Sequence, residues 1–351
     1  MRIDFLHACE KACEVLAESV STKQIRAGSL FAEQSGTRFA ANYGLALDPH
    51  AAYLLGSITK PIAICALMSL YDEKQFQLDD PLVRYLPEFS SSEFPKVTIK
   101  HLLTHTSGLP DQVASNQQLR SGLSPLDAFV AACKTLPFSF GPGTGYEYSS
   151  MGILLACTVA EKITSIPISQ LVKHRVLTPL QMNDSALGIG ELAQDSLMPV
   201  QTEFGAPEAG GGAVDAARWD WNSSYWRSLG APWGGAHASA SDVGTLLRAM
   251  MTDQDDFLKA STKRLMLTNH NPVGLESRGL GFDVDMRSSK VNCSTNSFGH
   301  SGSTGTLAWV DRDTQRICVV LTTLPGRALD ESKHPRHLAS EWIAKALPTK
   351  S

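Results

Sequence analysis

A serine and a lysine three residues apart could supply a nucleophile and the amine that activates it. They occur in the run Ser57-Ile58-Thr59-Lys60, which directly follows Gly56. Residues i and i+3 of a helix lie on one face, so the lysine amine can reach the serine hydroxyl. A serine hydroxyl attacks well only when a neighbour takes its proton, and a lysine whose charged form is disfavoured by burial is a candidate base. A serine N-cap followed by a solvated lysine would give the same spacing, so the motif alone does not decide.

Two further segments place polar side chains among glycines. Residues 141–150 form a turn-rich loop that brings Tyr148 to the start of an expected helix. Residues 298–305 contain His300 and lead into an apolar strand. Glycines at the edge of a strand often mark a close approach of a ligand or of another backbone segment. Both segments are candidate parts of a site with Ser57, although Tyr148 and His300 could also be ordinary buried side chains.

Other catalytic motifs are weak or missing from the sequence. His101 and His105 have the spacing of zinc ligands on a helix, but no glutamate lies between them, and we interpret them as structural. The sequence contains neither a glycine-rich phosphate-binding loop nor a Gly-x-Ser-x-Gly element. We therefore expect no metal ion and no cofactor.

After a first helix, the expected elements that must position these residues are strands, then mostly helices, and then strands again along the chain. Helical spacing of apolar residues predicts a helix over residues 3–20, and a hairpin is expected from the runs 27–32 and 38–43. A further strand-like run, 51–55, precedes a helix that is apolar nearly all round from Ser57 onward. The remaining expected elements are helices at 98–104, 125–135, 150–164, 167–175 and 241–252, an irregular loop at 203–217, strands at 279–286, 306–311 and 316–323, and a final helix at 330–346.

This order predicts an α/β (α+β) fold, in which two separated segments build one antiparallel sheet flanked by helices. We expect residues 1–77 and 256–351 to form this discontinuous sheet domain. Residues 78–255 would form a large, mostly helical inserted domain. The active site should lie in the cleft between the two domains.

The composition narrows the function classes. The 351 residues are 43% hydrophobic and 19% charged, which is typical of a soluble globular protein. The net charge of −4 argues against nucleic-acid or membrane-surface binding through bulk positive charge. The seven cysteines form no Cys-x-x-Cys pair, and neither a signal-like stretch nor a membrane-length apolar run occurs. We therefore expect a cytoplasmic protein without nucleic-acid or membrane partners, whose oligomeric state the sequence leaves open.

Taken together, the motifs resemble the serine β-lactamase and penicillin-recognising superfamily, in the branch of class C β-lactamases, D-Ala-D-Ala carboxypeptidases and family VIII carboxylesterases. The resemblance covers nearly the whole chain from residue 55 onward. The matching segments are residues 55–60, 78–87 and 97–109, the Tyr148 loop, Trp233-Gly234-Gly235 and His300-Ser301-Gly302. The resemblance implies a β-lactamase/transpeptidase-like fold and a serine hydrolase.

The resemblance also implies a role for individual residues. Ser57 would be the acylated nucleophile, Lys60 its lysine partner, and Tyr148 the tyrosine that passes a proton to the leaving group. Because a tyrosine normally titrates near pH 10, the Lys60 ammonium would be needed to polarise its phenol or hold a phenolate. The backbone N–H groups of Ser57 and Ser303 would form the oxyanion hole, which stabilises charge that develops in the transition state.

Two positions depart from the family's pattern. Ser150 stands where asparagine is frequent, and His300-Ser301-Gly302 replaces the Lys-Thr-Gly of β-lactamases. Histidine is neutral for much of its time at pH 7, and no lysine or arginine lies between Val291 and Val310 to bind a substrate carboxylate. Only a cation from a distant loop, such as Arg218 or Arg227, could replace it.

We therefore expect a carboxylesterase that forms an acyl-enzyme on Ser57 and cleaves small neutral esters. The alternative is a β-lactamase, or a D-amino-acid amidase or peptidase, that uses the same residues on an amide substrate. A catalytically silent binding or scaffold protein of the same fold is a second alternative. Trp233 belongs to a tryptophan cluster that could line the acyl pocket or simply pack in the core. The expected substrate-binding residues are Ser150, His300, Ser301, Gly302 and Trp233.

Overall fold

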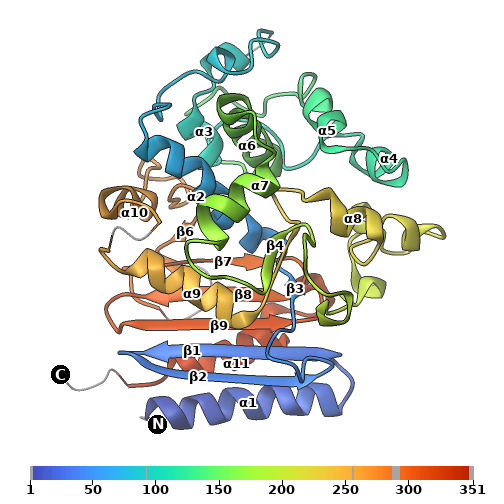
Figure 1. Ribbon diagram of the computed structural model, residues 1–351, viewed down its shortest axis with the longest axis vertical. Helices are drawn as coiled ribbons and strands as arrows, with labels where there is room; N and C mark the ends of the chain where they lie inside the picture. The colour runs from blue at the N-terminus through green and yellow to red at the C-terminus, as the bar shows by residue number, and fades with distance from the viewer. Residues whose placement is uncertain (1–2, 92, 255–256, 287–292, 348–351) are drawn as a thin grey trace.

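An antiparallel sheet organises the molecule. The computed structural model describes residues 3–91, 93–254, 257–286 and 293–347, and within them six strands follow the order β2-β1-β9-β8-β7-β6 (Figure 1). Strand β1 pairs with β9, with Gly28 opposite Thr322, so segments from both ends of the chain share one sheet, which confirms the predicted fold class. The strands are β1 (Ala27–Gln34), β2 (Thr37–Gly44), β6 (Asp283–Val284), β7 (Ser297–Gly302), β8 (Thr306–Asp311) and β9 (Arg316–Thr322).

Helices cover both faces of this sheet. On one face, α1 (Phe5–Ser21) packs beside α11 (Pro335–Ala344), and the Trp309 indole of β8 donates to Ser340 Oγ of α11 at 2.8 Å. Helix α9 (Ala240–Met251) packs on strands β1, β8 and β9 from the other side (Figure 1). Successive strand residues point to opposite faces, so the sheet contributes to two separate apolar cores.

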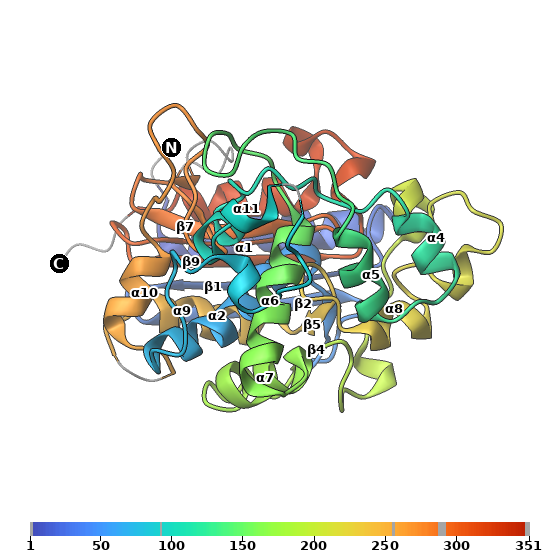
Figure 2. The same cartoon turned by 90° about the horizontal axis from the view of Figure 1, so that it is seen from above.

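The region between the two sheet-forming segments is mostly helical. Helix α2 (Thr59–Asp72) is buried from Thr59 to Leu70, as its all-round apolar sequence predicts, and α6 (Ser150–Thr164) packs across it (Figure 2). The division into domains at residues 78 and 255 remains a prediction. The other helices are α3 (Ile99–Leu103), α4 (Asn116–Ser121), α5 (Leu126–Cys133), α7 (Ile168–Val172), α8 (Ser224–Leu229) and α10 (Ala260–Met266).

A small second sheet joins the start of α2 to a distant loop. Its strand order is β3 (Tyr53–Leu54), β5 (Ala236–Ala238) and β4 (Ser185–Leu187). The Leu55 N–H donates to the Ala236 carbonyl at 2.9 Å directly beyond this sheet. The turn that carries Ser57 is thereby held against the Trp233 segment.

Some expected elements differ from the structure. The predicted strand 279–286 contracts to Asp283–Val284, because Gly281 has a φ of +81° that no regular strand adopts. The predicted helix 330–346 begins only at Pro335, which has no backbone N–H and suits a first helical turn. The His300 segment, for which no strand was predicted, forms strand β7, because ladder pairing with β6 and β8 overrides the low strand propensity of glycine.

Among the described residues, no single helix combines the length and apolar character needed to cross a membrane. Only α6 taken together with residues 168–177 reaches that length and composition, and the two parts meet at a bend of 83°.

Candidate active site

Ser57 lies in a tight 3₁₀ turn, Gly56–Ile58, that leads directly into α2. Gly56 has a φ of +56°, and a side chain there would come within 3.0 Å of the Ser303 backbone nitrogen. A side chain on Gly302 would meet the Leu55 carbonyl in the same way. Both glycines therefore permit the end of β7 to lie against the Ser57 turn. The backbones of Ser57 and Ser303, predicted to form the oxyanion hole, come together at this contact.

Lys60 is a buried amine directed at Ser57. Its Nζ donates to Ser57 Oγ at 2.9 Å and to the Trp233 carbonyl at 2.8 Å. Burial lowers the pKa of Lys60 to about 7, with the nearby Asp111 carboxylate opposing this effect and the Arg278 guanidinium adding to it. A substantial fraction of the amine is therefore neutral at pH 7 and able to accept a proton from Ser57.

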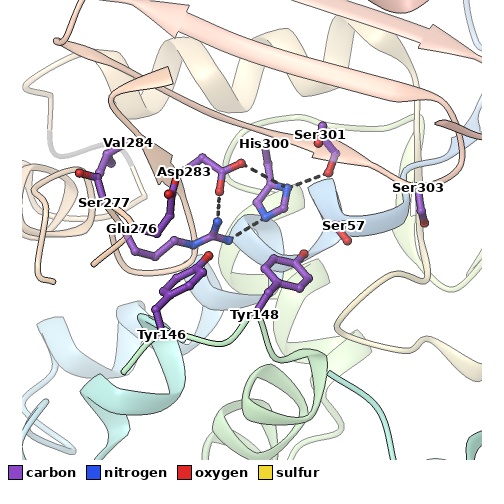
Figure 3. Close-up of a pocket in the computed structure, with 11 residues that line it drawn as sticks. Ser57, Tyr146, Tyr148, Glu276, Ser277, Asp283, Val284, His300, Ser301 and Ser303 are labelled. Atoms are coloured by element: carbon purple, nitrogen blue, oxygen red, sulfur yellow. Dashed lines mark hydrogen bonds and ion pairs between the residues drawn. The ribbon is translucent and has the colours of Figure 1, made fainter. Parts of the chain in front are cut away.

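Tyr148 closes the other side of Ser57. Its hydroxyl is buried and directed toward Ser57 (Figure 3). The Lys60 Nζ lies 4.7 Å from the centroid of its ring. Burial raises the pKa of Tyr148 well above its usual range, although Arg278 and the Ser57 hydroxyl oppose this effect. At neutral pH the side chain is a protonated phenol, which can give a proton to a leaving group.

His300 is buried and held as a neutral imidazole. Its Nε2 accepts from Arg278 Nη2 at 2.8 Å, since a guanidinium can only donate, and its Nδ1 donates to the Ser301 carbonyl at 2.7 Å. Burial lowers the pKa of His300 well below its usual range, and Arg278 and Lys60 add to this effect. The histidine therefore supplies no positive charge to the site.

The distant-loop cation that the sequence could not place beside His300 is Arg278, whereas Arg218 and Arg227 were the examples expected. Arg278 takes that place, because the pairing of β6 with β7 sets Asp283 opposite Gly299 and brings the preceding turn over the strand. Arg278 also forms a buried ion pair with Asp283 (Figure 3). The ion pair offsets its charge only in part, because Arg278 still lowers the pKa of Lys60 and of His300. The sequence alone does not give the register of this strand pairing, so it could not place Arg278 beside His300.

A cleft runs on both sides of Ser57. Its smaller part, about 360 Å³, is the polar lobe, and its larger part, about 760 Å³, is the tryptophan lobe. Ser57, Tyr148, Ser301 and Ser303 line both lobes. The polar lobe also contains Tyr146, Glu276, Ser277, Arg278, Asp283, Val284 and His300 (Figure 3). The tryptophan lobe also contains Lys60, Asp111, Asn116, Arg120, Ser150, Gly302 and the indoles of Trp221, Trp226 and Trp233.

The structure thus brings every predicted site residue to one cleft. Ser150 lines the tryptophan lobe, and its backbone N–H donates to Asp111 Oδ1 at 2.8 Å. Trp233 and Trp226 both line the cleft and also belong to the main hydrophobic core. These two tryptophans therefore line the pocket and pack in the core at the same time. Sequence reasoning missed Asp111, whose carboxylate acts on Lys60, and Arg120, which lies in a polar segment without a recognisable pattern.

His101 and His105 have structural partners. The Nδ1 of His101 accepts from the Thr98 N–H at 3.2 Å as part of a capping box on α3. The Nδ1 of His105 accepts from the Ser149 N–H at 3.1 Å, and its ring centroid lies 4.6 Å from that of Tyr148. His105 therefore supports the Tyr148 loop. Within the described ranges, no three His, Cys, Asp or Glu side chains gather in a way that could hold a metal ion.

Comparisons with known proteins show which family and which folds this chain is similar to. A family model described as Beta-lactamase matches residues 14–341. Esterase EstB of Burkholderia gladioli is 31% identical over 285 residues, which cover 73% of this chain and 71% of that protein. Two solved structures are also similar: EstCE1, "a hydrolase with promiscuous acyltransferase activity", and the D-amino acid amidase of Ochrobactrum anthropi. Each is 19% identical to this chain, and each match covers 96% of this chain and 98% of the other chain. The TM-scores are 0.75 for EstCE1 and 0.74 for the amidase. At that identity they show the fold alone.

Proposed function

The chain belongs to the beta-lactamase family and is a serine hydrolase, and we propose that it is a carboxylesterase that cleaves small esters through an acyl-enzyme on Ser57. The observation that carries the proposal is the 2.9 Å contact between the buried Lys60 amine and the Ser57 hydroxyl. In this contact a nucleophile lies beside a base whose pKa is lowered to about 7, near neutral pH.

Acylation would proceed as follows. Neutral Lys60 takes the hydroxyl proton as Ser57 Oγ attacks the ester carbonyl carbon. The N–H groups of Ser57 and Ser303 stabilise the negative charge on the carbonyl oxygen. When the tetrahedral intermediate collapses, the bond to the alcohol oxygen breaks, and that oxygen takes the proton of the Tyr148 phenol. Lys60 then returns its proton to Tyr148, so the amine and the phenol are both restored.

Deacylation would repeat these steps with water as the nucleophile. Lys60 accepts a proton from the attacking water, and the same backbone N–H groups hold the new oxyanion. Collapse of the second intermediate breaks the bond to Ser57 Oγ. The serine oxygen recovers a proton through Tyr148, and the carboxylic acid leaves.

Two observations support an ester substrate over a β-lactam. A relative that is 31% identical and matches 73% of this chain and 71% of its own length is named an esterase. A β-lactam presents a carboxylate, which is bound best by a free cation with charge-assisted donors. The His300 imidazole is neutral and Arg278 is paired with Asp283, so neither of these two side chains offers a carboxylate a free cation.

A substrate panel tests the assignment. Specificity constants are measured for 4-nitrophenyl butyrate, the cephalosporin nitrocefin and D-phenylalanine amide. We expect the ester to be favoured at least about a hundredfold over the cephalosporin, which corresponds to roughly 3 kcal/mol of transition-state binding. Equal or faster cephalosporin turnover would make the protein a β-lactamase, faster amide turnover would make it an amidase, and no turnover of any class would favour a silent binding protein.

A further inference from the structure

The Arg120 side chain lines the tryptophan lobe, and two of its nitrogens have no hydrogen-bond partner among the described residues. We propose that Arg120 forms an anion-binding subsite there that selects esters carrying one free carboxylate. The inference rests on the proposed function and narrows it from small esters in general. The subsite belongs to the aromatic side of the cleft, and it is distinct from the His300 segment.

The Arg120 side chain on α4 is buried, with 4% of its surface exposed. Its Nε and Nη2 have no hydrogen-bond partner among the described residues. No carboxylate of the described residues forms an ion pair with the Arg120 guanidinium. A charge taken out of water is strongly unfavourable unless other groups pair with it. An arginine that lines a cavity in this state is ready for an anionic ligand.

Two indole rings orient the guanidinium. Its central carbon lies 3.9 Å from the ring centroid of Trp226 and 5.9 Å from that of Trp219. Stacking on Trp226 occupies a face of the planar group, and the Nε and Nη2 donors along its edge are buried without a hydrogen-bond partner among the described residues. That edge has the fork geometry that binds a carboxylate through two parallel hydrogen bonds.

Nearby acidic groups do not neutralise Arg120. The Asp220 carboxylate accepts from the backbone N–H groups of Asn222 and Ser223 at 2.9 and 3.0 Å, and Glu208 is exposed. Burial lowers the pKa of Arg120 to about 10, while Tyr225, Glu208 and Asp220 oppose this effect. The side chain therefore stays positively charged at neutral pH.

A chain of contacts links Arg120 to the nucleophile. Lys60, which contacts Ser57, also donates to the Trp233 carbonyl, and the Trp233 ring centroid lies 6.2 Å from that of Trp226, on which Arg120 stacks. A substrate lying along these indoles could place its ester at Ser57 and its carboxylate at Arg120. An aliphatic chain would connect the two groups and pack on the aromatic rings.

The test measures binding without turnover. In a Ser57→Ala background, titration calorimetry compares monomethyl adipate and monomethyl suberate with the corresponding dimethyl esters, which lack the charge. We expect at least one monoester to bind at least tenfold more tightly than its diester. Arg120→Met should abolish this preference, Arg120→Lys should retain part of it, and Arg218→Met, which removes an exposed arginine of the same region outside the cleft, should leave it unchanged.

Equal affinities of monoester and diester at both chain lengths would overturn the proposal, whether or not the Arg120 variants fold. A preference that survives Arg120→Met would also overturn it, because another cation would then bind the carboxylate. Turnover of 4-nitrophenyl butyrate by the unmodified protein tests the carboxylesterase assignment separately. Failure of one proposal is thereby distinguished from failure of the other.

Discussion

The Arg278 guanidinium donates to His300 Nε2 at 2.8 Å and is itself paired with Asp283. The arrangement fixes His300 as the tautomer with its proton on Nδ1. It also places a cation near Lys60 and Tyr148, where it disfavours a proton on the amine and favours loss of one from the phenol. Arg278 thereby influences the proposed proton relay from outside the motifs that form it.

The first prediction concerns pH. Because the pKa of Lys60 is lowered to about 7, the amine is protonated below this pH and cannot accept the Ser57 proton. The specificity constant for 4-nitrophenyl butyrate should therefore fall as pH decreases through about 7 and level off above it. A profile measured from pH 5 to 9 checks this, and constant activity across that range would exclude Lys60 as the base.

The second prediction concerns Arg278. In Arg278→Met the repulsion on the Lys60 ammonium is lost, so the pKa of Lys60 should rise. The acid limb of the same pH profile should move to higher pH, whereas the exposed-site variant Arg218→Met should leave it in place. A limb that stays fixed or moves to lower pH in Arg278→Met would show that Arg278 has only a structural role.

The third prediction tests whether Lys60 and Tyr148 act together. Lys60→Ala and Tyr148→Phe should each reduce the acylation rate at least about a hundredfold, the usual contribution of a positioned acid or base. Because one relay needs both groups, the double variant should be little slower than either single variant. Single-turnover kinetics with 4-nitrophenyl butyrate measure all three. Losses that multiply would mean that the two residues work independently.

The fourth prediction is a gain of stability at the expense of activity. Holding the Lys60 amine at a pKa of about 7, down from 10.5, costs about 4 kcal/mol of folding free energy at pH 7, at about 1.4 kcal/mol per pH unit. Lys60→Met removes this cost but loses the hydrogen bond to the Trp233 carbonyl, worth about 1–3 kcal/mol. The variant should therefore be inactive yet about 1–3 kcal/mol more stable by urea unfolding.

The pH dependence of the stability difference between Lys60→Met and the unmodified protein provides a control for this prediction. Between pH 7 and 10.5 the unfolded chain binds more protons at Lys60 than the folded chain does, so the unfavourable contribution of Lys60 to the folding free energy decreases as pH rises. The advantage of Lys60→Met should shrink over that interval. An advantage that stays constant would come from packing and not from the buried amine.

Local sequence signals were enough for the elements around Ser57. The all-round apolar run after Ser57 predicts buried α2, and the helix predicted at 150–164 coincides with α6. The reason is that both patterns depend on residues close in sequence. The cluster of Ser57, Lys60, Tyr148 and His300 followed from resemblance, because these residues come from separate segments.

Long-range pairing accounts for what the sequence did not reveal. Arg278 reaches His300 only because β6 pairs with β7, and Arg120 reaches the cleft only because α4 packs near the indoles of Trp219 and Trp226. Neither position has a periodic pattern or a turn signal that points to the site. The electrostatic environment of the cleft therefore depended on tertiary contacts that no single segment encodes.

The central claim is that Ser57 carries the acyl group. The most direct measurement is peptide mass spectrometry after incubation with a fluorophosphonate, together with ester turnover by Ser57→Ala. We expect the adduct on the peptide that contains Ser57, and loss of both labelling and turnover by several orders of magnitude in a variant that still folds. Turnover of 4-nitrophenyl butyrate by folded Ser57→Ala at the rate of the unmodified protein would contradict the account.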